Sequence, residues 1–207
     1  MTQDRTCPNC GAALPPLLAH ARMVNCEFCG SSIVLEDDVV RKAGEAGEML
    51  DAAELIGLGR AVLLGDWGQF SATGHVRYDY GRGHWDEYYG QLSSGDMVWV
   101  SVDEGDVVIQ RPVTERVDGD GSAFRLGAEM TVNGIEYTCT EVSNAKASAF
   151  RGQLPEVIVI GETHLYANYI GAGGAALSAE RWTEPGAGVQ MAWFQGHWID
   201  PFEVRPA

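Results

Sequence analysis

Four cysteines near the N-terminus constrain this chain more than any other feature of its sequence. They form two Cys-x2-Cys pairs, Cys7 with Cys10 and Cys26 with Cys29, and a glycine follows each pair. Fifteen residues separate the pairs. A two-residue gap lets one tight turn aim two thiolates at the same ion, and the glycine permits the left-handed backbone of such a turn. The pattern predicts a structural Zn²⁺ site with these four cysteines as ligands.

Two other interpretations of the cysteines are a pair of disulfides and a redox-active Cys-x-x-Cys. Disulfides are typical of exported proteins, but no basic run followed by an apolar stretch opens the sequence. A redox motif is expected beside a βαβ pattern, which does not surround this duplicated motif. The sequence also has no run of about eighteen apolar residues, the length that spans a membrane. We therefore expect a cytoplasmic protein with no direct membrane insertion.

The segment 1–35 resembles a small bacterial zinc ribbon, on the basis of its two cysteine pairs and the strand-like residues 32–35. Four thiolates leave no open coordination position, so the metal is expected to stabilise the segment and not to catalyse a reaction. A segment this short buries too little apolar surface to fold alone, and metal binding would supply its folding free energy. We expect the ribbon either to dock a protein or to cap the next domain.

The charge of the chain narrows the kinds of partner. The sequence holds 29 acidic and 14 basic side chains, a net charge of −15, and all of the excess lies after residue 35. Such a charge repels nucleic acid, so no nucleic-acid partner is expected. The expected partner is a protein that is basic or membrane-associated, and any role at a membrane would pass through it.

The rest of the chain divides into a short connector and a β-rich body. Between Asp37 and Ile56, apolar residues recur every three or four positions, which predicts an amphipathic helix within residues 36–56. Beyond residue 57, short alternating runs separated by Gly, Asn and Asp predict antiparallel strands joined by hairpins. The expected fold class is mainly β, with the ribbon, the helical connector and an acidic β-rich domain over 57–207 that forms a small barrel or sandwich.

The expected strands have ordinary lengths and are separated by turn residues. They span residues 60–64, 69–80, 85–92, 96–102, 106–111, 130–133, 136–142, 157–160, 163–170, 190–195 and 197–204. Two stretches, 58–64 and 126–132, both open with Leu-Gly, continue as a strand and end in a turn. This likeness is compatible with two related halves, although the sequence pattern of hairpins alone can produce it.

Motifs of the body are similar to those of a known bacterial family. Residues 83–89 read Gly-His-Trp-Asp-Glu-Tyr-Tyr, and residues 97–105 read Met-Val-Trp-Val-Ser-Val-Asp-Glu-Gly. Residues 151–155 (Arg-Gly-Gln-Leu-Pro) and 177–180 (Leu-Ser-Ala-Glu) follow. Over residues 57–204 these motifs resemble the bacterial domain of unknown function 4178.

The resemblance departs from the family pattern at Tyr88, where tryptophan is usual, and at Gln153, where glutamate is usual. It implies a β-rich protein that often carries a zinc ribbon and has an accessory role. The family's members are encoded near small membrane proteins, polyamine-synthesis enzymes and envelope-stress components. The resemblance implies no reaction.

An exposed aromatic patch with an acidic rim is the expected partner-binding site. Aromatic anchors surrounded by polar groups dominate the energetics of protein interfaces. The residues of this hypothesis are Trp85, Asp86, Glu87, Tyr88, Tyr89, Trp99, Asp103 and Glu104. The first functional hypothesis is thus a non-catalytic accessory protein, in envelope stress or polyamine-linked processes. The alternative is an enzyme or sensor for a cationic small molecule such as a polyamine, which would need these side chains to converge in a concave pocket.

Ordinary structural roles are expected for four histidines and for the fifth cysteine. His75 and His84 lie near acidic residues in the sequence, an arrangement compatible with acid–base chemistry, but surface and turn roles are favoured. His164 and His197 are expected to be packing residues on strands. Cys139 has no histidine nearby in the sequence, so it is expected to be a buried, inert thiol.

Overall fold

Antiparallel strands form nearly all of the regular structure in this computed structural model, which describes residues 5–36, 39–49, 54–115, 117, 122–184 and 186–207. In the described residues, fourteen strands are hydrogen-bonded into one connected system. Helical structure within those residues is limited to 3₁₀ turns, at Gly65–Trp67, Ala172–Gly174 and Pro201–Glu203. No helix in these ranges has the length and apolar character needed to cross a membrane. The predicted fold class, mainly β and antiparallel, is confirmed.

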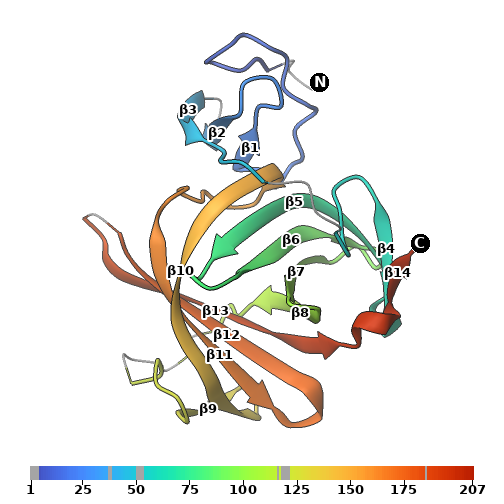
Figure 1. The fold of residues 1–207 in the computed structure, drawn as a ribbon, viewed down its shortest axis with the longest axis vertical. Helices are drawn as coiled ribbons and strands as arrows, with labels where there is room; N and C mark the ends of the chain where they lie inside the picture. The colour runs from blue at the N-terminus through green and yellow to red at the C-terminus, as the bar shows by residue number, and fades with distance from the viewer. Residues whose placement is uncertain (1–4, 37–38, 50–53, 116, 118–121, 185) are drawn as a thin grey trace.

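The N-terminal module is a small three-stranded sheet with its own core (Figure 1). Its strands are β1 (Met23–Asn25), β2 (Ser31–Glu36) and β3 (Val39–Glu45). The buried side chains that hold it together are Cys7, Leu14, Val24, Cys26, Ile33 and Leu35. Two of the cysteines are therefore part of the hydrophobic core, which is small for an independent module.

The predicted helix within 36–56 is wrong where the chain is described. Strand β3 occupies its first half and pairs with β2, while residues 37–38 and 50–53 lie outside the described residues. Two glycines lower the helix propensity of this stretch, and Gly47 adopts a left-handed φ of 73°. Because β2 offers an open edge with unpaired backbone groups, pairing outweighs a weak helical periodicity.

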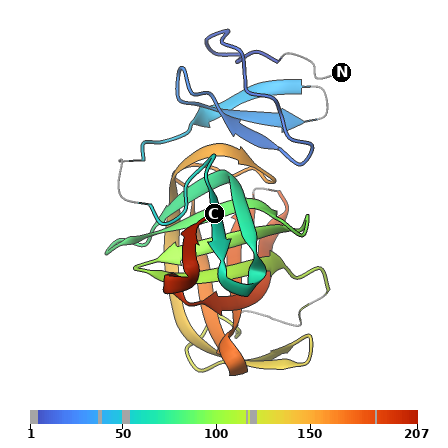
Figure 2. The ribbon, with the colours of Figure 1, turned by 90° about the vertical axis from the view of Figure 1, so that its right-hand side faces the viewer.

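Eight of the described strands close into a barrel (Figures 1 and 2). They are β5 (Gln69–Asp79), β6 (His84–Leu92), β7 (Met97–Asp103), β8 (Asp106–Pro112), β10 (Ile135–Leu154), β11 (Thr163–Gly171), β12 (Ala175–Glu184) and β13 (Gly188–Ile199). Neighbours run β5-β6-β7-β8-β13-β12-β11-β10, and the pairing of β10 with β5 closes the ring. Of the two predicted architectures, the barrel is the one observed.

The barrel consists of two meanders with the same strand order. Each starts with a short strand outside the ring, β4 (Ala61–Leu64) in the first and β9 (Glu129–Val132) in the second. Four consecutive ring strands follow in each, and the meanders join at the β8–β13 and β5–β10 pairings. The two stretches that read alike in sequence thus form equivalent hairpins, β4–β5 and β9–β10. Strand β14 (Val204–Pro206) pairs with β4.

Alternation along the ring strands separates an inner core from two outer cores. On β7, Trp99 belongs to the inner cluster, whereas its neighbours Val98 and Val100 pack outward with residues of β4 and β14. A second outer cluster covers the other meander and contains Cys139 and Trp193. Cys139 is 3% exposed, as predicted for a buried thiol. Both faces of the barrel wall are therefore covered by apolar contacts over much of their area.

Several strand predictions differ from the structure, and β10 continues to Leu154, well beyond the predicted segment 136–142. Residues 157–160 form no strand, β12 was not predicted, and the two segments expected over 190–204 are mostly one strand, β13, that continues through Gly196. A Cβ at Gly196 would lie 1.8 Å from the Ile109 carbonyl oxygen of β8. This glycine therefore marks a close approach of two strands and not a turn.

The ribbon and the barrel share a hydrogen-bonded edge. Strand β1 pairs with the end of β10, where Met23 lies opposite Leu154. Met23 and Ala46 belong to the inner barrel cluster, and the His20 ring contacts Tyr89 at 5.2 Å between ring centroids. The ribbon therefore covers one end of the barrel interior.

Candidate functional site

The four cysteines predicted as metal ligands lie together in the ribbon. All four Sγ atoms are within 4.8 Å of one another, with Cys7 and Cys29 at 3.7 Å and Cys10 and Cys26 at 3.8 Å. Four sulfurs around a tetrahedral ion with bonds of about 2.3 Å are about 3.8 Å apart, whereas a disulfide bond is about 2.05 Å long. The cysteines are therefore close enough to bind one metal ion, and all are free thiols.

The backbone around the cysteines is shaped as the spacing predicts. Gly11 and Gly30 have φ values of 75° and 68°, and their amides donate to the carbonyls of Cys7 and Cys26. Cys29 Sγ is hydrogen-bonded with the Ser31 hydroxyl at 3.2 Å, and Asn9 donates to it as well. These two contacts, together with hydrogen bonds from the Ser31 backbone amide and Cys10, lower the pKa of Cys29 to about 6, which favours the thiolate form.

The predicted exposed aromatic patch on the barrel is wrong, because its aromatic side chains are buried. Trp85 and Tyr89 are 9% exposed, Trp99 is 3% exposed and Tyr88 is 2% exposed. Three of them lie in the inner cluster, and Tyr88 lies in an outer one. Residues that alternate along β6 cannot all share one surface of a barrel wall. The assignment of the eight residues to a partner surface stays a prediction, now without an exposed aromatic anchor.

We expect Trp85→Ala to destabilise the fold by about 3 kcal/mol, because a large buried ring is replaced by a cavity. The Trp85 ring packs against Tyr78 and Tyr166, each at 4.9 Å between centroids. Urea unfolding followed by far-UV circular dichroism measures this loss. Trp67→Ala is the matched control. Because Trp67 is 38% exposed, this substitution should lower the free energy of unfolding far less. Equal stabilities of the two variants would place Trp85 outside the core.

Acidic residues of the predicted patch separate into two environments. Asp86 lies outside the barrel, where His75 Nε2 and Arg77 Nε both lie 2.8 Å from its Oδ1. Burial raises the pKa of Asp86, but these hydrogen bonds outweigh it and bring the pKa to about 2. His75 is 2% exposed and stacks on Tyr88. This network holds the β5–β6 pair together and, like exposed His84 and Glu104, does not reach the barrel interior.

The barrel interior contains a cavity of about 180 Å³ beyond the inner aromatic cluster. Along the β6–β7 ladder, the Tyr89–Trp99 pair lies beneath the ribbon, the Glu87–Ser101 pair follows, and Asp103 lies at the far end. Asp106 and Trp198 are accessible there and form the mouth. The cavity therefore opens at the end of the barrel away from the ribbon and has room for a small organic molecule.

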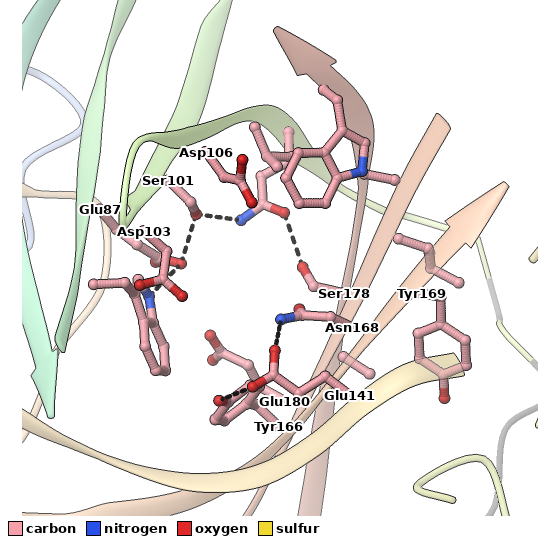
Figure 3. A pocket seen from close by; sticks show the side chains of 17 residues that line it. Glu87, Ser101, Asp103, Asp106, Glu141, Tyr166, Asn168, Tyr169, Ser178 and Glu180 are labelled. Carbon is pink, nitrogen blue, oxygen red and sulfur yellow. Dashed lines mark hydrogen bonds between the residues drawn. The ribbon is translucent and has the colours of Figure 1, made fainter. Parts of the chain in front are cut away.

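Carboxylates dominate the charge of this cavity (Figure 3). Five line it, Glu87, Asp103, Asp106, Glu141 and Glu180, and none of its described lining residues is Lys, Arg or His. Glu141 accepts hydrogen bonds from the Tyr166 hydroxyl at 2.8 Å and from Asn168 Nδ2 at 3.0 Å. Aromatic rings of Trp85, Tyr166 and Trp198 complete the wall. The lining thus combines an excess of negative charge with π faces.

Sequence reasoning found only Trp85, Glu87 and Asp103 of this cavity. Glu141 and Glu180, from β10 and β12, were missed, as were the polar residues Gln110 and Ser178. A signal was present on β12, where Ser178 and Glu180 alternate with the apolar Leu177 and Ala179. This alternation identifies cavity residues only when the strand face that points into the barrel is known.

The fold and the site together define a closed antiparallel β-barrel with an acidic internal cavity and a four-cysteine module at one end. Residues 66–201, more than half of the chain, match the family described as Domain of unknown function (DUF4178). The chain belongs to this family, as the motifs of its body predicted. No curated protein and no solved structure matches the chain.

Proposed function

We propose that the protein is a non-catalytic binding protein that holds a small organic cation inside its barrel. The observation that carries this proposal is the presence of five carboxylates around one cavity whose described lining has no basic side chain. Unpaired buried charges of one sign are costly, and a bound cation offsets that cost. Aromatic faces beside the carboxylates add cation–π attraction. Polyamines belong to this chemical class.

We propose zinc as the metal of the ribbon and a structural role for it. Four thiolates in a closed tetrahedral arrangement favour Zn²⁺, and they leave no position for a substrate. When bound, the ion would tie both cysteine pairs to one point. The reduced thiols that it requires support the proposed cytoplasmic location.

The test of the cation proposal compares three probes of similar size: n-butylammonium, n-butanol and butyrate. Isothermal titration calorimetry at low ionic strength should show saturable binding of n-butylammonium and none of the other two. Binding should be lost in the double variant Glu87→Gln/Glu180→Gln. Glu136→Gln is the matched control, because Glu136 is an exposed acid on β10 outside the cavity lining. Equal binding of the neutral probe, or unchanged binding in the double variant, would reject the proposal.

A protein partner is a second candidate, now centred on the ribbon. Phe28 is 79% exposed between the ligands Cys26 and Cys29, where the backbone turn holds it in place. Exposed aromatic side chains on a rigid turn are suited to docking. The acidic barrel surface supports a basic or membrane-associated partner, in envelope stress or polyamine-linked processes. Phe28→Ala should abolish recovery of such a partner in affinity purification, and unchanged recovery would exclude this role.

A further inference from the structure

Two acids that face the barrel cavity, both only partly exposed, have unlike surroundings. Oε1 of Glu87 accepts hydrogen bonds from Trp85 Nε1 at 3.2 Å and from the Ser101 hydroxyl at 2.9 Å. Glu180 has no hydrogen-bond donor among the described residues, and the ring nitrogen of His164 lies 4.0 Å from it. Donors aimed at a carboxylate stabilise its charged form. The structure therefore favours charge on Glu87 over charge on Glu180.

One donor to Glu87, the Ser101 hydroxyl, belongs to a relay that runs from β12 through β8 to β7 along the cavity side of the barrel wall (Figure 3). The Ser178 hydroxyl donates to Gln110 Oε1 at 2.8 Å, and Gln110 Nε2 lies 3.3 Å from Ser101 Oγ. Ser178 therefore donates to Gln110, Gln110 donates to Ser101, and the Ser101 hydroxyl donates to Glu87. Strand β13 lies between β12 and β8, and its residue opposite Gln110 is Gly196, which places no side chain over the relay. Such chains polarise each member and strengthen the final hydrogen bond.

Burial and the charges around Glu87 and Glu180 also favour ionisation of Glu87 over ionisation of Glu180. Burial raises the pKa of Glu87 to about 7 against the lowering effect of its donors, and it raises the pKa of Glu180 well above the ordinary value, with repulsion from Glu87 and Glu156 adding to the effect. Burial lowers the pKa of His164 to about 4, so this ring offers Glu180 no positive charge at neutral pH. The other titratable groups that face the pair are Tyr78, Asp103, Asp106, Glu141, Glu156 and Tyr166. None of these groups can carry a positive charge.

We infer that Glu87 is the anionic anchor of the bound cation, that Ser178, Gln110 and Ser101 are positioning residues that hold its charge, and that Glu180 is kept protonated. This inference rests on the proposed function. A cation with one charge then needs only Glu87 in its ionised form. Below the pKa of Glu87, binding must displace a proton, and the affinity falls up to tenfold for each pH unit. Above that pKa, the affinity should level off.

The charge assignment can be tested without any ligand. Carbon-13 NMR of the side-chain carboxyls, followed against pH in the free protein, should show that Glu87 ionises before Glu180. Ser101→Ala removes a direct donor and should raise the midpoint of Glu87 by about one unit, with a smaller rise in Ser178→Ala. Ser71→Ala is the matched control, because Ser71 is exposed on β5, and it should move neither midpoint. Earlier ionisation of Glu180, or an unmoved Glu87 midpoint in Ser101→Ala, would overturn the inference.

The second test measures the affinity for n-butylammonium between pH 5.5 and 8.5. The affinity of the wild type should rise with pH and then level off, and the rise should move to higher pH in Ser101→Ala. A variant with a merely weakened fold would lower the affinity at every pH without moving the profile. If the ionisation order holds but the probe does not bind, the proposed function and the anchor role fail while the charge assignment stands. If the probe binds with no dependence on pH, the anchor role alone fails.

Discussion

Cys26→Ser is expected to lose the bound metal and most of the structure of the ribbon. Cys26 is 1% exposed and belongs to both the predicted ligand set and the ribbon core. Binding free energies of structural zinc sites are on the order of 10 kcal/mol, more than a small module gains from its apolar core. Elemental analysis should show a fall from one zinc per chain to almost none. Amide hydrogen exchange should accelerate throughout residues 5–36 and 39–49.

The effect of Cys26→Ser should extend into the barrel only where the two parts share hydrogen bonds. Gly30 accepts from the amide of Ala46, and Ala46 accepts from the amide of Phe150 on β10. We therefore expect faster exchange near Phe150 and Leu154, with protection retained in β6–β8. The matched control is Cys139→Ser, because Cys139 is buried in an outer barrel cluster and is not in the ligand set. Retained metal in Cys26→Ser, or lost metal in Cys139→Ser, would contradict the assigned site.

Gly196→Val is expected to lower the free energy of unfolding by about 5 kcal/mol, near the upper limit for a single substitution. An added Cβ would lie 1.8 Å from the Ile109 carbonyl oxygen and 2.7 Å from Gln110 Cα, both backbone atoms of β8. Because backbone atoms cannot rotate away, the two strands would have to separate at the β8–β13 junction between the meanders. Urea unfolding, followed by tryptophan fluorescence, measures the loss.

Gly44→Val provides the control for this prediction. Gly44 also lies in a strand, β3, but an added Cβ would meet no atom within 4 Å. Its effect on stability should stay within about 0.5 kcal/mol. Comparable losses in the two variants would show that any larger residue at a strand glycine is harmful, and that the close approach at Gly196 is not the cause.

Local sequence patterns predicted the structural elements that are determined by residues close together in the chain. Alternating runs bounded by turn residues identified most strands, and the two Cys-x2-Cys-Gly motifs predicted a cluster that the structure brings together. The connector failed because β3 is decided by a partner, β2, that supplies an open edge. Propensity over one segment contains no information about such an edge.

The cavity could not be predicted because its position depends on barrel closure. The β5–β10 pairing, Val76 with Phe150 for example, joins residues far apart in the chain. Without that pairing, alternation on β6 separates Trp85 and Glu87 from Asp86 and Tyr88 but does not show which pair faces inward. Outer cover by β4 and β14 makes both faces partly apolar, which removes the usual contrast between a core face and a solvent face.

The acidic composition of the chain therefore has two separate consequences. Exposed carboxylates contribute to the formal net charge of −15 and repel polyanions from the surface. Interior carboxylates such as Glu87 and Glu141 count toward the same formal sum, but they line the cavity that we propose as a cation site. Composition alone does not distinguish these two groups.

The most direct test of the central claim, that the barrel interior is a cation site, is to locate a bound probe. In an isotope-filtered NOE experiment with saturating n-butylammonium, the methylene protons of the probe should show contacts to the rings of Trp85, Tyr166 and Trp198. Contacts confined to exposed residues such as Phe202, or none to the cavity rings at any concentration, would contradict the account.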